Sequence, residues 1–378
     1  MALLKNIWIR GIIIICLLIG GICFLQDYNQ VEKPTLVSTQ GRSFEKATVI
    51  DIVKDNLQED GSRIGDQVVL LKMETGEKKG EVLEANSPNG LLFGTACREG
   101  LEVITISSSV GQLNVTTVYN VDRSMPIYIF IALFLGALCL IGGKKGIKSA
   151  IAIVFSFICI VYLFFPMIMK GHSPFVSAIF TATIITAVTI FLINGFTIKA
   201  VSAILATFCG LLIAGITADC FGYFTSLSGY NVSNIESLLF IGQNTLIDVG
   251  ELLFAGVLFA SLGAVMDIAM DVSSAVHELH LKNPDLKPKE LFKSGMNVGR
   301  DIMGTMSTTL ILAFFGGSLG VWVLDYVYDL PYLQLINSNS IGIEIMQGIS
   351  GSFGVILTVP IVAAFSAWFP YYIEQRKK

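Results

Sequence analysis

Three acidic residues interrupt a mostly apolar stretch in the middle of the chain, GELLFAGVLFASLGAVMDIAMDVSSAVHELH at residues 250–280. Glu251 stands near its start, and Asp267 and Asp271 stand one helical turn apart toward its end. A carboxylate held in hydrocarbon costs roughly 2.5–3.5 kcal/mol even on lenient insertion scales, so it needs a charged partner, a wet cavity or a position at the membrane edge. These acids are therefore the first candidates for chemistry.

A helical projection places two of these acids on one face together with small residues, because successive residues turn by about 100°. That face consists of Gly256, Ala260, Gly263, Ala264, Asp267, Asp271 and Ser274. Small-residue faces of membrane helices pack closely against neighbours, so we expect Asp267 and Asp271 to point into the bundle near its cytoplasmic end. Glu251 lies nearly opposite and about 24 Å away along the axis. Glu251 and Asp248, one turn apart, are weaker candidates because solvation at the outer edge alone can explain them.

The next apolar segment begins GMNVGRDIMGTMSTTL at residue 295 and also has a polar, small face. The face carries Asn297, Asp301, Gly304, Thr305 and Thr308. If the two faces meet, Asp267, Asp271, Asn297, Asp301 and Thr305 would form one intramembrane cluster, with Arg300 near enough to pair with a carboxylate. Three acids and one arginine leave spare negative charge, which suits a cation or a proton. The alternative is an ion-pair network that only holds the two helices together.

No other motif predicts catalysis, a metal site or a cofactor. His277 and His280 flank Glu278, but this is not the H-E-x-x-H spacing of zinc sites and no third ligand follows. The chain shows no G-x-S-x-G elbow and no P-loop. An aspartyl dyad of Asp267 and Asp271 is disfavoured because both lie on one helix. We therefore expect no enzyme activity, no catalytic residue, no metal and no cofactor.

The composition determines the class of protein. Of 378 residues, 53% are hydrophobic and 14% charged, and the mean hydropathy is +0.70, values typical of an integral membrane protein whose first partner is the lipid bilayer. The net charge of −4 provides no basic surface for phosphate backbones, so nucleic acid is excluded as an expected partner.

The elements that position the acids are apolar stretches of about 20 residues, long enough to cross a hydrocarbon core. About eight are predicted, at residues 7–25, 126–142, 147–168, 174–193, 199–218, 250–271, 302–324 and 346–369. The first has a basic flank and no small-residue cleavage site, so residues 1–25 are interpreted as a cytoplasmic end with a retained signal anchor. Residues 234–249 are too short and polar to span and predict an interfacial or re-entrant helix. KPKELFKSG, after residue 286, predicts a short surface helix.

Lysine and arginine predict the orientation, since short cytoplasmic loops carry their excess. They gather before the first span, after the second, fourth and sixth spans, and at the C-terminal end, whereas the opposite short loops contain only Lys170. Both termini are therefore expected in the cytoplasm and residues 26–124 outside the cell membrane. Residues 125–378 would form a seven-helix membrane domain.

The segment 26–124 has a different pattern, with runs such as ATVIDIV, DQVVLLKM and LEVITIS separated by charges and turn residues. These runs have the length and the Val, Ile and Thr content of strands. The overall fold class is thus an all-α polytopic membrane bundle with a small all-β extracytoplasmic domain of five or six strands between its first two helices. Only Cys97 of the seven cysteines lies in this domain, so no disulfide can form within it. It contains no catalytic constellation, and we expect it to bind, gate or assemble.

The stretch GELLFAGVLFASLGAVMDIAMDVSSAVHEL, followed by LFKSGMNVGRDIMGTMSTTLILAFFGGSLG, resembles the YibE/F family of bacterial multi-pass membrane proteins. The resemblance extends over most of the chain and is sharpest from Asp248 to Gly320. It implies an integral membrane protein of a bacterium, and the paired family name suggests a paralogous membrane protein as a partner. It carries no site assignment.

Two functions remain open. The first is a transporter or exporter of unknown substrate that uses the acidic cluster. The second is a non-transporting scaffold or signalling module whose β domain binds a partner while the helices anchor it. A wet path to Asp267 would favour transport, and a dry, fully paired cluster would favour the scaffold.

Overall fold

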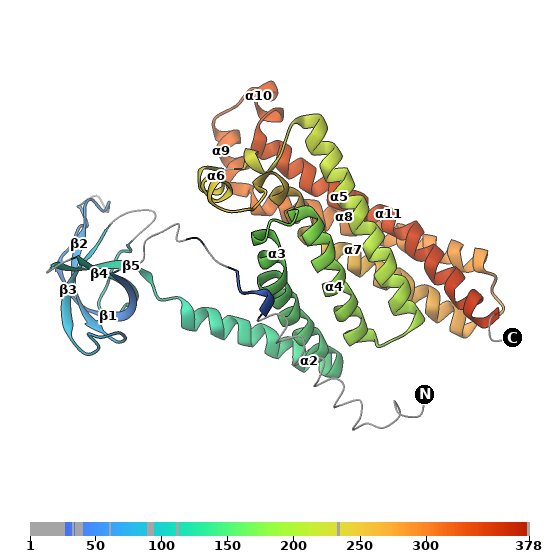
Figure 1. Ribbon diagram of the computed structural model, residues 1–378, viewed down its shortest axis with the longest axis horizontal. Helices are drawn as coiled ribbons and strands as arrows, with labels where there is room; N and C mark the ends of the chain where they lie inside the picture. The colour runs from blue at the N-terminus through green and yellow to red at the C-terminus, as the bar shows by residue number, and fades with distance from the viewer. Residues whose placement is uncertain are drawn as a thin grey trace. The chain divides into compact units, whose positions relative to one another are not determined.

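The computed structural model describes residues 27–31, 34, 41–59, 62–88, 94–110, 113–232 and 235–375 (Figure 1). The predicted signal anchor at residues 7–25 lies outside the described residues. The chain divides into two compact units, Thr35–Ala137 and the remainder, which are described separately.

The first unit is a closed β-barrel, and its strands include the runs rich in Val, Ile and Thr that were predicted as strands. They are β1 (Arg42–Lys54), β2 (Gln67–Met73), β3 (Val82–Ser87), β4 (Glu102–Val110) and β5 (Leu113–Val121). The order around the barrel is β1-β2-β3-β5-β4, and the pair β3–β5 is parallel. Five strands in such an order make the small Greek-key barrel known from OB folds. The prediction of a small all-β domain is confirmed.

The long strand β1 closes the barrel, because it pairs with β2 along one edge and with β4 along the other. Its pairing with β2 shifts register between Val49 and Asp51 and again between Ile52 and Lys54. Such bulges bend a strand and allow a short sheet to curve onto itself. The interior is filled by alternate side chains, among which Val69, Leu71 and Val103 are 0% exposed.

The helices follow in an almost unbroken series, and the boundary between the two units falls within the first of them, after Ala137. They are α2 (Ser124–Cys159), a π-helical turn (Ile160–Phe164), α3 (Phe165–Met169), α4 (Pro174–Asn194), α5 (Ile198–Thr225), a 3-10 turn (Gly229–Asn231), α6 (Ile235–Asn244), α7 (Val249–Lys282), α8 (Pro288–Gly317), α9 (Leu319–Val327), α10 (Tyr332–Ile336) and α11 (Asn339–Gln375). At about 1.5 Å per residue the ten residues of α6 reach roughly 15 Å. This agrees with the prediction of a non-spanning helix between residues 234 and 249.

The segment α2 contains a sharp break at Gly143, whose φ of 53° and ψ of −132° are not helical. Glycine adopts this backbone conformation easily because it has no Cβ. The chain then folds back closely enough that a Cβ built on Gly146 would collide with the carbonyl oxygen of Leu138. The predicted separation of the segments 126–142 and 147–168 at this glycine is confirmed.

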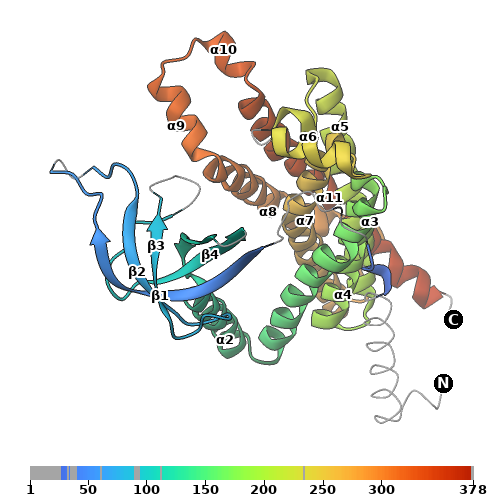
Figure 2. The same ribbon diagram turned by 60° about the vertical axis from the view of Figure 1, so that its left-hand side comes forward.

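The predicted span 302–324 and the predicted surface helix before it are wrong in their boundaries. A single helix, α8, begins at Pro288 and continues to Gly317, and α9 then leaves it at an angle of 66° (Figure 2). Glycines at 316, 317 and 320 surround the break at Ser318 and disfavour a continuous helix. KPKELFKSG therefore forms the first turns of a long helix.

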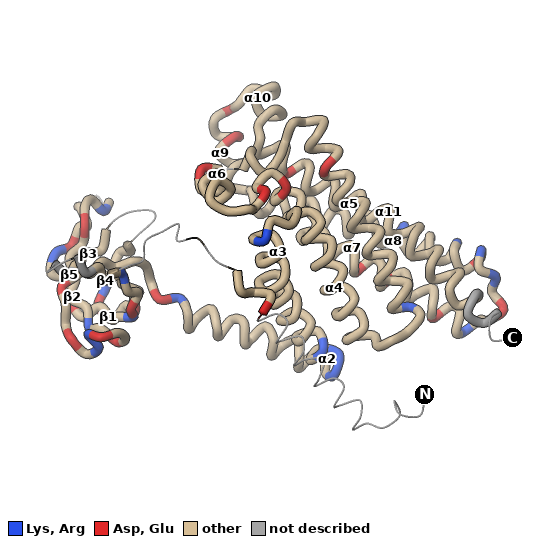
Figure 3. The backbone as a smooth tube through the Cα atoms, viewed as in Figure 1, with Lys and Arg blue, Asp and Glu red and all other residues tan. Residues whose placement is uncertain are grey.

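Within the described residues, five helical segments are long and apolar enough to cross a membrane, or six if α8 and α9 are counted as one broken span. The protein is thus a membrane protein with a helical bundle, and the total of eight spans stays a prediction. The bundle is organised around α7, which packs against α4, α5, α8 and α11. Its core includes Val265 and Ile268 of α7 and Val355 and Val359 of α11, all at most 1% exposed. Figure 3 shows that charged residues are dense on the barrel strands and sparse along these helices.

Candidate functional site

The helix α7 turns its large residues toward the core and its small, acidic face outward. Val257, Leu258, Val265 and Ile268 are each 0% exposed. On the opposite side, Gly256, Ala260, Gly263, Asp267 and Asp271 are exposed, and a Cβ added at Gly256 or Gly263 would meet no atom within 4 Å. The expectation that this face points into the bundle is therefore wrong for the single chain. The Val, Leu and Ile side has more apolar area to bury against α5 and α11.

The helix α8 is arranged in the same way. Its glycines at 295 and 299 approach its neighbours, because a Cβ on Gly295 would lie 2.8 Å from Val276 of α7 and 3.1 Å from Ala363 of α11. The opposite face exposes the predicted site residues Asn297, Arg300, Asp301 and Thr305. The sequence correctly placed Asn297, Asp301 and Thr305 on one face, but that face is not covered by another part of the described chain.

The six predicted site residues of α7 and α8 nevertheless lie within one zone of the bundle that is about 12 Å deep. Val276 contacts the position of Gly295, and Ser261 and Leu310 both flank Gly351, so α7 and α8 run antiparallel with a fixed offset. Asp271 lies five residues before Val276 on α7, and Arg300 lies five residues after Gly295 on α8. Because the helices are antiparallel, Asp271 and Arg300 are therefore at the same level. We call Asp267, Asp271, Asn297, Arg300, Asp301 and Thr305 the polar band. By this offset they span eight residue steps, or about 12 Å of depth.

The charges of the polar band are not paired with one another. Among the described residues, no salt bridge includes Asp267, Asp271, Arg300 or Asp301. The Thr305 hydroxyl donates a hydrogen bond to the carbonyl of Ile302 in its own helix, at 2.8 Å. The band thus combines exposed carboxylates, an amide and a guanidinium, with an excess of negative charge.

The two weaker candidates at the other end of α7 have structural contacts. Asp248 caps α7, since its Oδ1 accepts a hydrogen bond from the backbone N–H of Gly250 at 2.9 Å. Glu251 accepts from the Ser173 hydroxyl and from the backbone N–H of Phe175 at 3.3 Å, and these residues begin α4. Both carboxylates satisfy helix N-termini, as acidic residues commonly do. The fold itself accounts for them.

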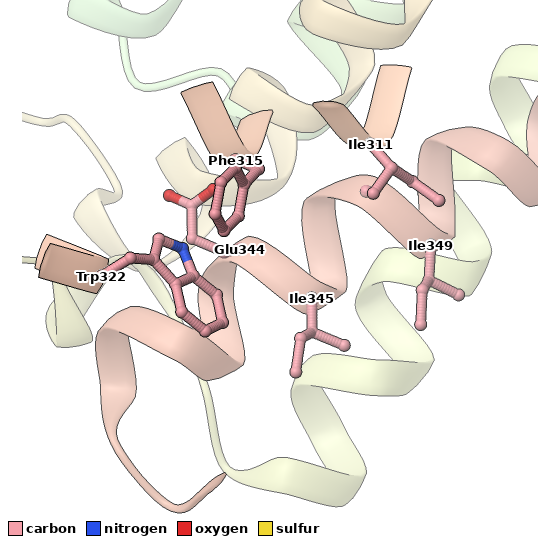
Figure 4. A pocket seen from close by; sticks show the side chains of 7 residues that line it. Ile311, Phe315, Trp322, Glu344, Ile345 and Ile349 are labelled. Carbon is pink, nitrogen blue, oxygen red and sulfur yellow. The ribbon is translucent and has the colours of Figure 1, made fainter. Parts of the chain in front are cut away.

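A second acidic position was not found by the sequence analysis. Glu344 of α11 lies beside the break between α8 and α9, where the Ser318 hydroxyl donates a hydrogen bond to its Oε1. Figure 4 shows the carboxylate beside the Phe315 ring and near the nitrogen of Trp322, and all three residues line a pocket. The signals that could have revealed it are the acid within the apolar run IGIEIM and the glycine-rich break FFGGSLG.

Metal binding finds no support in the part of the chain that the structure describes, where no group of three or more His, Cys, Asp or Glu side chains could hold an ion. His277 and His280 lie on the last turns of α7.

Comparisons with known proteins give one result. Neither the curated proteins nor the solved structures include a match to the chain. A family model described as YibE/F-like protein matches residues 130–371, which include the polar band and Glu344 and exclude the β strands. Because the match covers well over half of the chain, this protein belongs to the YibE/F-like family of membrane proteins.

Proposed function

We propose that the protein is a subunit of a transporter in the bacterial cell membrane and that its polar band lines the path of a cation or proton. The supporting observation is the exposure of four charged side chains within one zone of the bundle without an ion pair among the described residues. Charges within a bilayer face a wet cavity or another protein, because lipid solvates them poorly. Three carboxylates against one guanidinium favour a positively charged species.

The proposal includes a second membrane chain, either another copy or a paralogous member of the same family, which covers the band from lipid. Small exposed residues at Gly256, Ala260 and Gly263 permit the close approach of another helix. The path would then run between the two chains. In this proposal the chain has eight spans and both termini in the cytoplasm, as the positive-inside rule predicts, and no enzyme activity.

The test is flux into proteoliposomes that contain the purified protein, under an imposed pH gradient and with a panel of monovalent and divalent cations. We expect Asp267→Asn to reduce flux at least about tenfold, because it removes a charge from the path. The matched control is Asp285→Asn, which removes an exposed carboxylate from the α7–α8 loop outside the band. Unchanged flux in Asp267→Asn, or no flux of any ion in the wild type reconstituted both alone and together with its paralogue, would rule the proposal out.

The alternative is a scaffold or signalling module, and the observation in its favour is that the barrel is a compact unit with a hydrophobic core of its own. For this function the membrane helices serve as an anchor, and the barrel binds an external partner. Absence of flux together with a stably folded Asp267→Asn protein would favour it. Native mass spectrometry of the protein extracted from its membrane then identifies the bound partner.

A further inference from the structure

A pocket opens on the surface of the bundle where α9 turns away from α8. Its volume is about 360 Å³, within the range of small-molecule sites. The walls come from α8 and α9 on one side and α11 on the other, and they include Ile311, Phe315, Trp322, Ile345 and Ile349. The Phe315 and Trp322 rings form a tilted pair with centroids 5.2 Å apart. The pocket is therefore apolar and aromatic almost throughout.

Glu344 provides a charged side chain in this otherwise apolar pocket wall. Its Oε1 is held by the Ser318 hydroxyl, whereas its buried Oε2 has no hydrogen-bond partner among the described residues. The indole Nε1 of Trp322 is likewise buried and unpartnered within the described part of the chain. Figure 4 shows this nitrogen on the side of the ring that faces the carboxylate. Buried polar atoms without partners are costly, so a bound molecule that satisfies them gains affinity.

We propose that this pocket binds an organic ammonium cation. The Glu344 carboxylate would pair with the positive charge, and the faces of Phe315 and Trp322 would contribute cation–π attraction and apolar contact. An oxygen on the ligand, or a water, would accept the hydrogen bond of the indole. An inorganic cation fits poorly, because hard cations require six or more oxygen ligands, whereas this wall offers one carboxylate and one hydroxyl.

This site is separate from the polar band. Gly348 lies beside Ile311, so Glu344 is level with Phe315. Phe315 is fifteen residues beyond Arg300 on α8, or about 22 Å along the axis. Binding at Glu344 can therefore be measured whether or not the band carries ions.

The experiment measures equilibrium binding of radiolabelled phenyltrimethylammonium to the purified full-length protein in dodecyl maltoside, a detergent without an ammonium group. We expect saturable binding that Glu344→Gln weakens at least about tenfold, since it removes the charge and keeps the shape. Trp322→Leu removes the aromatic face and should weaken binding about threefold or more. Asp329→Asn, which removes an exposed carboxylate just after α9, is the matched control and should stay within about twofold.

The neutral competitor tert-butylbenzene has the same shape as the probe and no charge. We expect it to displace the cation poorly. If it competes as well as unlabelled phenyltrimethylammonium, the pocket holds an apolar molecule such as a lipid chain and the proposal is wrong. It is also wrong if the wild type shows no saturable binding or if Glu344→Gln binds normally. Should Glu344→Gln fail to fold, Glu344→Asp and Trp322→Leu provide the test, because the first should retain binding and the second should weaken it about threefold or more.

Discussion

In the β-barrel, Lys46 and Asp122 lie 2.6 Å apart and Arg63 and Asp55 lie 2.8 Å apart, each as a salt bridge. In the helical bundle, by contrast, the charges of the polar band form no salt bridge within the described chain, although these helices are long and apolar enough to cross a membrane. The barrel thus contains paired charges of opposite sign, whereas the polar band exposes its charges without such pairs.

The barrel satisfies buried polar groups with its own atoms, although Oε2 of Glu45 is buried without a partner among the described residues. Gln67, for example, accepts a hydrogen bond from the Cys97 N–H at 2.8 Å and donates one to the Cys97 carbonyl at 3.2 Å. The bundle satisfies its apolar core internally but leaves charged side chains for water, an ion or another chain. The polar groups of the barrel thus contribute to its folding stability, and those of the polar band are the ones on which the proposed function rests.

The largest expected effect comes from replacing a buried glycine of the bundle with a large residue, and an exposed glycine provides the comparison. A Cβ on Gly210 would lie 2.7 Å from Val265 and 3.3 Å from the carbonyl oxygen of Gly354, so Gly210→Leu should destabilise the protein by about 3 kcal/mol or more. Gly263→Leu enters open space and should change stability by at most about 0.5 kcal/mol. Thermal unfolding in detergent measures both, and equal losses would contradict the exposed position of Gly263.

In the barrel, Gln67→Ala should cost about 3 kcal/mol, because the buried N–H and carbonyl of Cys97 lose their partner. Hydrogen exchange followed by mass spectrometry on the full-length protein should show faster exchange in β2 and around Cys97. Gln58→Ala removes an exposed side chain that donates a hydrogen bond to the Asn56 carbonyl at 3.3 Å, and it serves as the control. Unchanged protection in Gln67→Ala would show that water replaces the amide.

The barrel should also lose stability in acid. The hydrogen bond from Lys46, together with those from Ser124, lowers the pKa of Asp122 to about 2 from its usual 3.8. A lowered pKa contributes stability above the unfolded value, and this contribution declines as the pH falls from about 4 toward 2. Hydrogen exchange of the barrel between pH 5 and 2.5 should show the decline in the wild type and a weaker one in Asp122→Asn. Parallel pH profiles of the wild type and Asp122→Asn would show that Asp122 does not cause the loss of stability in acid.

The smallest expected effect on stability is that of replacing charges of the polar band, and it directly tests whether these charges lack ion-pair partners. Arg300→Gln and Asp301→Asn break no ion pair of the described chain, so each should shift the stability of the detergent-solubilised protein by at most about 0.5 kcal/mol. Thermal unfolding measures this shift. A loss of about 2 kcal/mol or more from either variant would reveal a partner for these charges and make the band an ion-pair network.

Much of the fold could be predicted from the chain alone. Apolar length located α4, α5, α7 and α11, and runs rich in Val, Ile and Thr predicted the small all-β domain that precedes α2. The paired glycines at 142 and 143 marked the break in α2. These features depend on residues near one another in sequence, whose spacing directly reflects helical or strand geometry. The boundaries of α8 and α9 were missed because a glycine cluster permits a break without requiring one.

The sequence by itself determined which residues share a helix face, and so it grouped Asp267 with Asp271 and Asn297 with Asp301. Only the tertiary structure decided which face the bundle buries, because a projection of α7 shows a small-residue face and a Val, Leu and Ile face that could each pack inward. Packing against α5 and α11 selected the larger apolar face. Tertiary structure also brought Ser318, Trp322 and Glu344 together, since residues that far apart in the chain become neighbours only when α11 packs against α8.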